Sequence, residues 1–478
     1  MASIPRAPSR RPVARRGPSP GLAAALCTAL CAAAPAVATA DAAAVNAALG
    51  RGLNLGHALE APFEGAWGVT LEAGDFDTIA EAGFDSVRVP VRWSAHTGES
   101  PPYAVDEAML ERVGWVLDQA ERTGLGAVVN VHLYDALSER PGAERARFLA
   151  IWRQLGERYA SRPASVAFEL LNEPNAALDA DPGAWNALAH DALAAVRASN
   201  PTRAVLIGPV GFNAIDRLED LELPDDPNLI ATVHYYEPFA FTHQGASWVS
   251  PVPPVDTTWS PADTSLGRAF YDGSWNTSVE PADGRLRVGF GAKWAGFSLN
   301  HPTPYTPTAY RLTVSGRARA SVICRGAADF AEVGEIDVSG ADPTRVAIDL
   351  SACGPGTRDV ALQNLLDDAP AFAIERGALC DATGCEDVVT TAGRIVREDM
   401  GVAAAWAARE GVPLNVGEFG VHDPAPMDSR ASWTRRVQAE ARRVGASTHY
   451  WSYSSANFGA WDPATGAWRA PLLRALLR

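Results

Sequence analysis

The sequence predicts an α/β protein, a (β/α)8 barrel with a β-sandwich inserted after the sixth strand. Three observations predict this fold. Eight short apolar runs alternate with amphipathic stretches, nearly every run ends in polar side chains, and about 125 residues after the sixth run differ in texture. The alternative is an open doubly wound sheet, which would gather its ligand groups at one switch point rather than at most strand ends.

The barrel strands are expected where short apolar runs occur. These runs are residues 51–55, 86–89, 127–131, 166–171, 204–207, 230–235, 414–416 and 447–451. Between most of them, as in 106–123, 143–160 and 185–199, apolar residues recur at the three- and four-residue spacing of a helix. Strands that alternate with helices favour a parallel sheet closed into a barrel.

One connection breaks this alternation. A Pro-rich run with Pro251, Pro253 and Pro254 follows the sixth strand, and short strand-like runs separated by Gly, Asp and Pro come after it. A structureless loop of this length would be improbable inside a compact domain. We therefore expect a β-sandwich domain at 262–386, inserted into a barrel that comprises 41–261 and 387–478.

Four cysteines lie in or near the predicted insert, namely Cys324, Cys353, Cys380 and Cys385. Their spacing lacks the paired Cys-x-x-Cys of a four-cysteine zinc site. In an exported chain, disulfides are expected instead, and four cysteines allow three pairings. Cys324–Cys353 with Cys380–Cys385 is the most local of the three.

Residues 1–40 have the features of a signal peptide. Arg6, Arg10, Arg11, Arg15 and Arg16 precede an apolar stretch at 21–37, and Ala38-Thr39-Ala40 provides a small-residue cleavage site. The apolar stretch is short for a membrane span. The mature protein is therefore expected to be secreted, extracellular or periplasmic, with the Sec and twin-arginine routes both open.

Charge narrows the class of partner. The full chain has a formal net charge of −15, and removal of the five signal arginines would bring it to −20. Such a surface disfavours nucleic acid and anionic membranes and favours solubility. We expect a monomer that binds neither nucleic acid nor membranes.

Two peptides carry most of the chemical information. Leu171-Asn172-Glu173-Pro174 and Gly417-Glu418-Phe419-Gly420 each place a glutamate just past an apolar run. Hydrolysis of a glycosidic bond requires two carboxyl groups, one that holds a proton for the leaving oxygen and one that stays ionised. The pair therefore indicates glycoside hydrolysis, with solvated surface carboxylates as the alternative.

Other polar side chains follow the remaining strands. They are Arg88 at the end of strand two, His132 at the end of strand three, Asn172 at the end of strand four, His234 and Tyr236 at the end of strand six, and Trp451 at the end of strand eight. In a (β/α)8 barrel these strand ends share one face. Two His and two Glu could also suggest a metal site, but no His-x-x-x-His pair or Asp cluster supports one, so no metal and no cofactor is expected.

This ordered set resembles glycoside hydrolase family 5, the cellulase-type retaining glycosidases. Gly52-Leu53-Asn54-Leu55-Gly56 and the segment from Gly83 to Pro90 also fit that family. The resemblance covers about 46–250 and 390–478 and does not obviously cover the insert. It implies an enzyme with glutamates after strands four and seven of a barrel.

The resemblance also implies a role for each residue of the set. Glu173 would be the general acid/base and Glu418 the nucleophile. Asn172 would bind the sugar 2-hydroxyl, Arg88 and Tyr236 would surround the nucleophile, His132 and His234 would line the subsite at the cleaved bond, and Trp451 would lie under that sugar. Structural roles are the alternative for Arg88, His132, His234 and Trp451, and Glu169 could pair with Arg88.

Two pKa values should then move apart. Arg88 and Tyr236 should lower the pKa of Glu418, and the ionised Glu418 should raise that of Glu173. Additional sugar contacts are expected from loop residues on the same face, namely His57, Trp67, Trp93, His96 and Trp461.

We therefore expect a retaining glycoside hydrolase that cleaves a β-linked glucan polysaccharide or oligosaccharide, with an endo-β-1,4-glucanase as first choice. A mannanase, a mixed-linkage or β-1,3-glucanase of the same family, and a non-catalytic carbohydrate-binding surface protein are the alternatives.

Overall fold

Eight parallel strands close into a barrel in the computed structural model, which describes residues 41–326 and 330–478. The barrel strands are β1 (Arg51–Asn54), β2 (Ser86–Val91), β3 (Gly126–Val131), β4 (Val166–Glu169), β5 (Val205–Ile207), β6 (Leu229–Tyr235), β18 (Leu414–Phe419) and β19 (Ser447–Tyr450). β1 pairs in parallel with both β2 and β19, which closes the ring. The predicted barrel is confirmed.

Several strand ends differ from those expected, and two of the differences lie beside the glutamates. β4 stops at Glu169, two residues before the end of its apolar run, whereas β18 continues through Phe419. Glu418 therefore lies within its strand rather than just past it. The register of β18 against β6 and β19 shifts beside Glu418, and such irregularities redirect a side chain.

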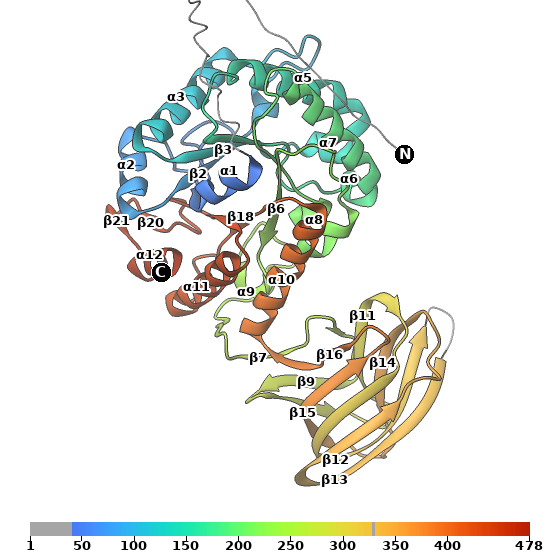
Figure 1. Ribbon diagram of the computed structural model, residues 1–478. Coiled ribbons are helices and arrows are strands. Elements are labelled where there is room, and N and C mark those ends of the chain that lie inside the picture. Colours follow the sequence, from blue (N-terminus) through green and yellow to red (C-terminus); the bar gives the residue numbers. More distant parts are fainter. Residues whose placement is uncertain (1–40, 327–329) are drawn as a thin grey trace, which may run out of the picture. The chain divides into compact units, whose positions relative to one another are not determined.

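Helices surround the strands on the outside of the barrel (Figure 1). The longer ones are α2 (Ala73–Ala82), α3 (Glu107–Thr123), α5 (Pro141–Arg158), α7 (Pro182–Arg197), α10 (Ala392–Glu410), α11 (Met427–Arg443) and α12 (Ala470–Leu477). In α3 the Asp106 side chain caps the first turn, and Gly124 ends the helix in the left-handed conformation, with φ of 78°. Its buried residues, such as Val113 and Leu117, face the strands and join the main apolar core.

Short elements occupy the loops between the strands and the longer helices. They are η1 (Trp93–His96), α4 (Asp135–Glu139), α6 (Ala177–Ala180), α8 (Val210–Asn213), η2 (Ile215–Asp220), α9 (Phe239–Thr242), β20 (Trp461–Asp462) and β21 (Ala467–Trp468). α8 follows β5, and α9 follows β6.

A separate small helix packs against the barrel interior. Ala42, Val45 and Leu49 of α1 (Ala42–Leu49) form one apolar cluster with buried residues of the strands. These strand residues are Val128, Ala167, Ala204, Leu206 and Ile230. Successive side chains of β3 point to opposite faces of the sheet, so Val128 lies in this cluster and Val129 lies in the main core with the outer helices.

The region after the sixth strand is antiparallel, as predicted. β7 (Thr264–Leu266) pairs with β17 (Val389–Thr391) where the chain leaves and rejoins the barrel. Between them lie β8 (Tyr271–Asp272), β9 (Thr277–Ala282), β10 (Arg285–Phe290), β11 (Gly296–Tyr305), β12 (Ala309–Gly326), β13 (Phe330–Asp349), β14 (Thr357–Asn364), β15 (Ala371–Cys380) and β16 (Cys385–Asp387).

The long strand β12 joins two limbs of this sheet. One limb consists of β15, β10 and β9, and the other of β14, β11 and β8. Its first half pairs with β15 and its second half with β14, while β13 runs along its other edge. Val288 and Ile374 of one limb share a buried cluster with Phe297 and Leu362 of the other. The limbs therefore face each other as a β-sandwich, although the boundaries 262 and 386 stay a prediction.

Both disulfides of the structure follow the local pairing. Cys324 bonds Cys353, and Cys380 bonds Cys385. Cys324 and Cys353 are buried in the sandwich core, so this bond ties β12 to the segment after β13. The predicted signal peptide lies outside the described residues and stays a prediction. Within those residues, no helix has the length and apolar character needed to cross a bilayer.

Candidate active site

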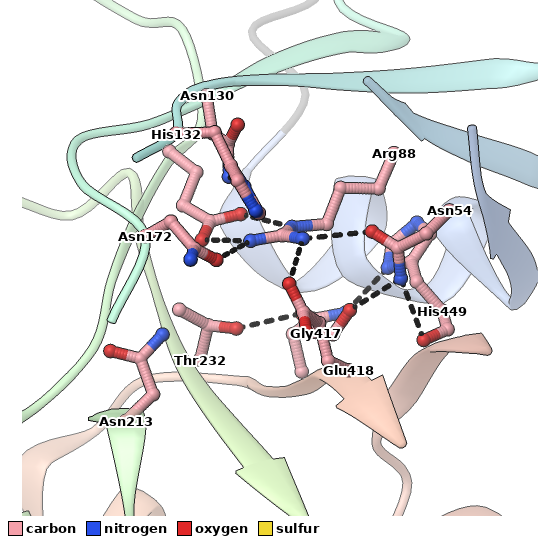
Figure 2. A network of polar contacts seen from close by, with 12 residues as sticks. Asn54, Arg88, Asn130, His132, Asn172, Asn213, Thr232, Gly417, Glu418 and His449 are labelled. Carbon is pink, nitrogen blue, oxygen red and sulfur yellow. Dashed lines mark hydrogen bonds and ion pairs between the residues drawn. The ribbon is translucent and has the colours of Figure 1, made fainter. Parts of the chain in front are cut away.

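Arg88 on β2 is the centre of a buried polar network (Figure 2). Its Nε and Nη2 donate to the two oxygens of Glu169 at 2.7 and 2.8 Å. Nη1 donates to Asn54 Oδ1 at 2.8 Å and to Glu418 Oε1 at 2.7 Å. Nη2 also donates to Asn172 Oδ1 at 2.7 Å. All five N–H groups of the guanidinium are thus used.

Charge balance explains why this arginine can be buried. Its side chain and that of Glu169 are both 0% exposed, and Glu418 is nearly so. Burial opposes the positive charge, but the Glu169 and Glu418 carboxylates raise the pKa of Arg88 and keep it ionised. Glu169 therefore serves as the structural partner that the sequence suggested, and Arg88 is still free to bind Glu418.

Two glycines allow Glu418 to occupy this position. A Cβ at Gly417 would come 2.7 Å from Thr232 Oγ1, and one at Gly420 would overlap the carbonyl oxygen of Trp451. The Gly-Glu-Phe-Gly frame thus lets β18 pack closely against β6 and against the segment after β19.

Glu418 has fixed donors on both oxygens. Besides the Arg88 bond to Oε1, the Tyr236 hydroxyl donates to Oε2 at 3.1 Å. The expected direction of its pKa shift was wrong, however. Burial raises the pKa of Glu418 more than His234 and Arg88 lower it, because the carboxyl group is almost entirely removed from water.

Glu173 lies in a different environment. It follows β4 in the left-handed conformation, with φ of 48°, and 27% of its side chain is exposed. Its Oε1 lies 2.8 Å from His234 Nδ1. Burial raises the pKa of Glu173 to about 7, Arg88 opposes the rise and Glu169 adds to it. The direction was predicted, but its main cause is burial rather than the charge of Glu418.

The two glutamates lie close together. One oxygen of each and a ring nitrogen of His234 lie within 4.8 Å of one another. Three such atoms could suit a metal ion, but the fixed positive charge of Arg88 on Glu418 opposes a cation there. The expectation of a metal-free site stays a prediction.

The structure brings the remaining predicted residues to the same place. Trp451, directly after β19, lies parallel to the buried ring of His132, with centroids 5.7 Å apart and 7° between the planes. His57 meets Trp451 edge-on, and Trp67 meets His57 in the same way. An apolar indole bordered by imidazoles offers a surface for the C–H groups of a sugar ring.

Four of the five secondary candidates divide into two groups. His57 and Trp67 join Trp451, as just described. Trp93 is 0% exposed and donates its indole N–H to the backbone of Asn130, so it is core rather than a sugar contact. Trp461 packs on Tyr453 and Trp468 in the small β20–β21 hairpin. Position in a loop therefore did not distinguish residues that lie beside Trp451 from residues that pack elsewhere.

Several residues of the site escaped prediction. Asn54 binds Arg88, Asn213 contacts His234, and both are fully buried. Glu60 is 1% exposed, accepts from the backbone of His57 and Ala58, and has its pKa raised to about 7 by burial. A polar residue inside an apolar strand, such as Asn54, is a usable signal, because buried polar groups need partners.

Replacement of Arg88 by lysine should destabilise the fold. An ammonium has three donors for five acceptors, so buried oxygens lose their partners and the free energy of unfolding should fall by about 3 kcal/mol. Arg122→Lys is the matched control, because the Arg122–Asp77 pair is about half exposed (46% and 47%). That change should leave the free energy of unfolding nearly unchanged, because the exposed pair is screened by water. Equal losses in urea unfolding would contradict the central role of Arg88.

Comparison with known proteins identifies a family that the chain resembles. The model of the family described as Cellulase (glycosyl hydrolase family 5) matches residues 51–280, a range that includes Glu173 but not Glu418. Endoglucanase H of Acetivibrio thermocellus is 38% identical over 193 residues, which are 40% of this chain and 21% of that protein. Endoglucanase C of the same organism is 34% identical over 184 residues, 36% of this chain and 52% of that protein. The chain thus spans a fifth to a half of these curated relatives.

Solved structures match over more of the chain. A hyperthermophilic endo-β-1,4-glucanase in complex with substrate is 28% identical, covers 91% of this chain and 99% of its own, and has a TM-score of 0.63. Thermotoga maritima Cel5A in complex with mannotriose is 27% identical, covers 91% and 100%, and has a TM-score of 0.62. The resemblance inferred from the sequence motifs is thereby confirmed, and the match to the model of glycosyl hydrolase family 5 extends over residues 51–280.

Proposed function

We propose that this chain is a retaining glycoside hydrolase that cleaves a β-linked glucan, with endo-β-1,4-glucanase activity as first choice. The observation that carries the proposal is the pair formed by Glu173 and Glu418, two carboxyl groups in contrasting environments with oxygens within 4.8 Å. Inverting enzymes hold their carboxyl groups about 6.5–9.5 Å apart, to admit a water, and retaining enzymes about 5–5.5 Å apart. The short separation supports retention.

The reaction would proceed in two displacements. Glu418 attacks the anomeric carbon while Glu173 gives its proton to the leaving oxygen, so that the glycosidic bond breaks and a glycosyl-enzyme ester forms. Glu173 then takes a proton from water, whose oxygen attacks the same carbon and releases Glu418. Each glutamate returns to its starting state.

Hydrogen bonding supports this division of roles. Arg88 and Tyr236 both donate to Glu418, which favours its anion and fixes the direction of attack. Glu173 is partly exposed to solvent, where a leaving group can reach it, and its pKa of about 7 lets it hold a proton near neutral pH.

Substrate contacts follow from the same geometry. Arg88 donates a hydrogen bond to Asn172 Oδ1, so the amino group of Asn172 is left to bind a sugar 2-hydroxyl. Trp451, His132 and His234 would border the sugar at the cleaved bond. We propose these as substrate-binding groups together with Arg88 and Tyr236, which act through Glu418.

The preference for β-1,4-glucan rests on the relatives. Their names include endoglucanases and an endo-β-1,4-glucanase, and a structure of one neighbour contains mannotriose. Rates on carboxymethyl cellulose, β-mannan, lichenan and laminarin, measured side by side, would choose among the linkages. Failure on all four would favour the non-catalytic carbohydrate-binding alternative. Export, a monomeric state and independence of metals and cofactors are part of the proposal.

Removal of each glutamate should have a different effect. Glu173→Ala should lose turnover of polymer but keep activity on aryl glycosides with good leaving groups, and azide should restore part of the rate because the nucleophile survives. Glu418→Ala should lose turnover of every β-glycoside. Glu219→Ala, at a side chain that is 71% exposed on the surface, is the control and should match the unmodified enzyme. Equal residual rates in the Glu173 and Glu418 variants would count against the assigned roles.

The pH dependence should report the acid. Glu173 must be protonated to act, so kcat/KM on a cello-oligosaccharide should fall as pH rises through about 7. Glu418 must be ionised, so kcat/KM should also fall at low pH. On an activated aryl glycoside, Glu173→Ala should lack the high-pH fall. Persistence of that fall in the variant would assign it to another group.

A further inference from the structure

A buried amide lies behind the histidine that contacts Glu173. Asn213, at the end of α8 after β5, is 0% exposed, and its Nδ2 lies 3.3 Å from His234 Nε2. Figure 2 draws Asn213 together with the residues around Arg88. Oδ1 of Asn213 has no hydrogen-bond partner among the described residues, so the contact with the imidazole is the one that holds the amide.

The backbone is built to hold an asparagine here. Asn213 has φ of 59°, in the left-handed region that asparagine tolerates better than most residues. A Cβ at residue 208 would come 2.6 Å from Asn213 Oδ1, so Gly208 leaves the space that the amide occupies. An asparagine in a left-handed turn and a glycine beneath it are both needed for this contact.

His234 connects Asn213 to the acid. Burial lowers the pKa of His234 to about 4, so its ring is neutral near neutral pH and carries a single N–H. Nε2 faces the amino group of Asn213 and must accept a hydrogen bond there, which leaves the ring proton on Nδ1. Nδ1 lies 2.8 Å from Glu173 Oε1 and 3.8 Å from Glu418 Oε2.

We propose that Asn213 is a positioning residue that fixes His234 in the Nδ1–H tautomer and thereby keeps the acid proton of Glu173 on Oε2. Oε1 accepts the Nδ1–H bond, so the carboxylic proton resides on the other oxygen and is available to the leaving group. This inference rests on the proposed role of Glu173 as the general acid.

The other tautomer would work against the reaction. An unprotonated Nδ1 would accept a hydrogen bond from the carboxylic O–H of Glu173 and so keep the proton directed away from the leaving oxygen. It would also favour the protonated form of Glu173, whereas an Nδ1–H donor favours the ionised form. Loss of Asn213 should therefore raise the pKa of Glu173 and weaken proton delivery at the same time.

Nitrogen-15 NMR of histidine-labelled protein tests the tautomer directly. The His234 signals, assigned by their loss in His234→Gln, should show a protonated Nδ1 and an unprotonated Nε2 in the unmodified enzyme. A protonated Nε2 with a bare Nδ1 would overturn the proposal without any Asn213 variant. In Asn213→Gly, which keeps the left-handed turn free of strain, the two nitrogen signals should move toward each other as both tautomers become populated.

Kinetics of the same variant separate positioning from mere structure. Asn213→Gly should lower kcat/KM on a cello-oligosaccharide at least tenfold, lower it less than threefold on a dinitrophenyl cellobioside, and move the high-pH fall to higher pH. Asn276→Gly is the matched control, because Asn276 is also a left-handed asparagine, with φ of 46°, in the inserted sheet region. It should change none of these quantities.

The outcomes distinguish this inference from the function on which it rests. Equal losses on both substrates with an unmoved pH profile, or no loss at all, would overturn the role of Asn213. If Glu173→Ala also hydrolysed the cello-oligosaccharide at the unmodified rate, the proposed function would fall instead. A silent Asn213→Gly beside an inactive Glu173→Ala would reject only the positioning role.

Discussion

The five hydrogen bonds of Arg88 are the constraint on which the site depends. They join side chains from β1, β2, β4, the segment after β4, and β18 into one buried unit. A buried guanidinium is tolerated only when its partners are complete, because each unpaired donor or charge in the interior is costly. The spacing of these strands therefore cannot change without disrupting the network, and the carboxylate of Glu418 is held in a fixed position by its bond to Arg88.

Around this fixed centre, the two glutamates differ in what surrounds them. Glu418 is tied by a cation and a phenol, whereas Glu173 meets a neutral imidazole and opens partly to solvent. Burial raises the pKa of both, so the difference in role comes from hydrogen bonding and access rather than from opposite shifts. The arrangement suits an acid that exchanges protons with substrate and a nucleophile that keeps one orientation.

Much of the fold could be predicted because it follows from local patterns. Apolar runs of strand length located all eight strands, and the two glutamates stood out by their frames. The extension of β18 through Glu418 could not be predicted, because it depends on a register shift against β6 and β19, which are distant in sequence. The predicted direction of the pKa shift of Glu418 was wrong for a similar reason, because the burial of this side chain is produced by the assembled barrel.

The sequence also could not predict which individual side chains contact the site. Trp93 and Trp451 both follow barrel strands. Trp93, however, is buried and donates its indole N–H to the backbone of Asn130, whereas Trp451 stacks on His132. Asn213 has the appearance of an ordinary turn residue, and only the folded chain reveals the imidazole beside it. Residue type and strand order thus indicated the kind of chemistry, while contacts between distant segments decided which side chains take part in it.

The stereochemistry of the first product tests the central claim most directly. Proton NMR of a β-linked cello-oligosaccharide during the first minutes of hydrolysis, before mutarotation mixes the anomers, shows which anomer of the new reducing end is released. Double displacement by Glu418 with Glu173 as acid and base predicts the β-anomer. Initial release of the α-anomer would mean that water attacks directly, and it would contradict the account.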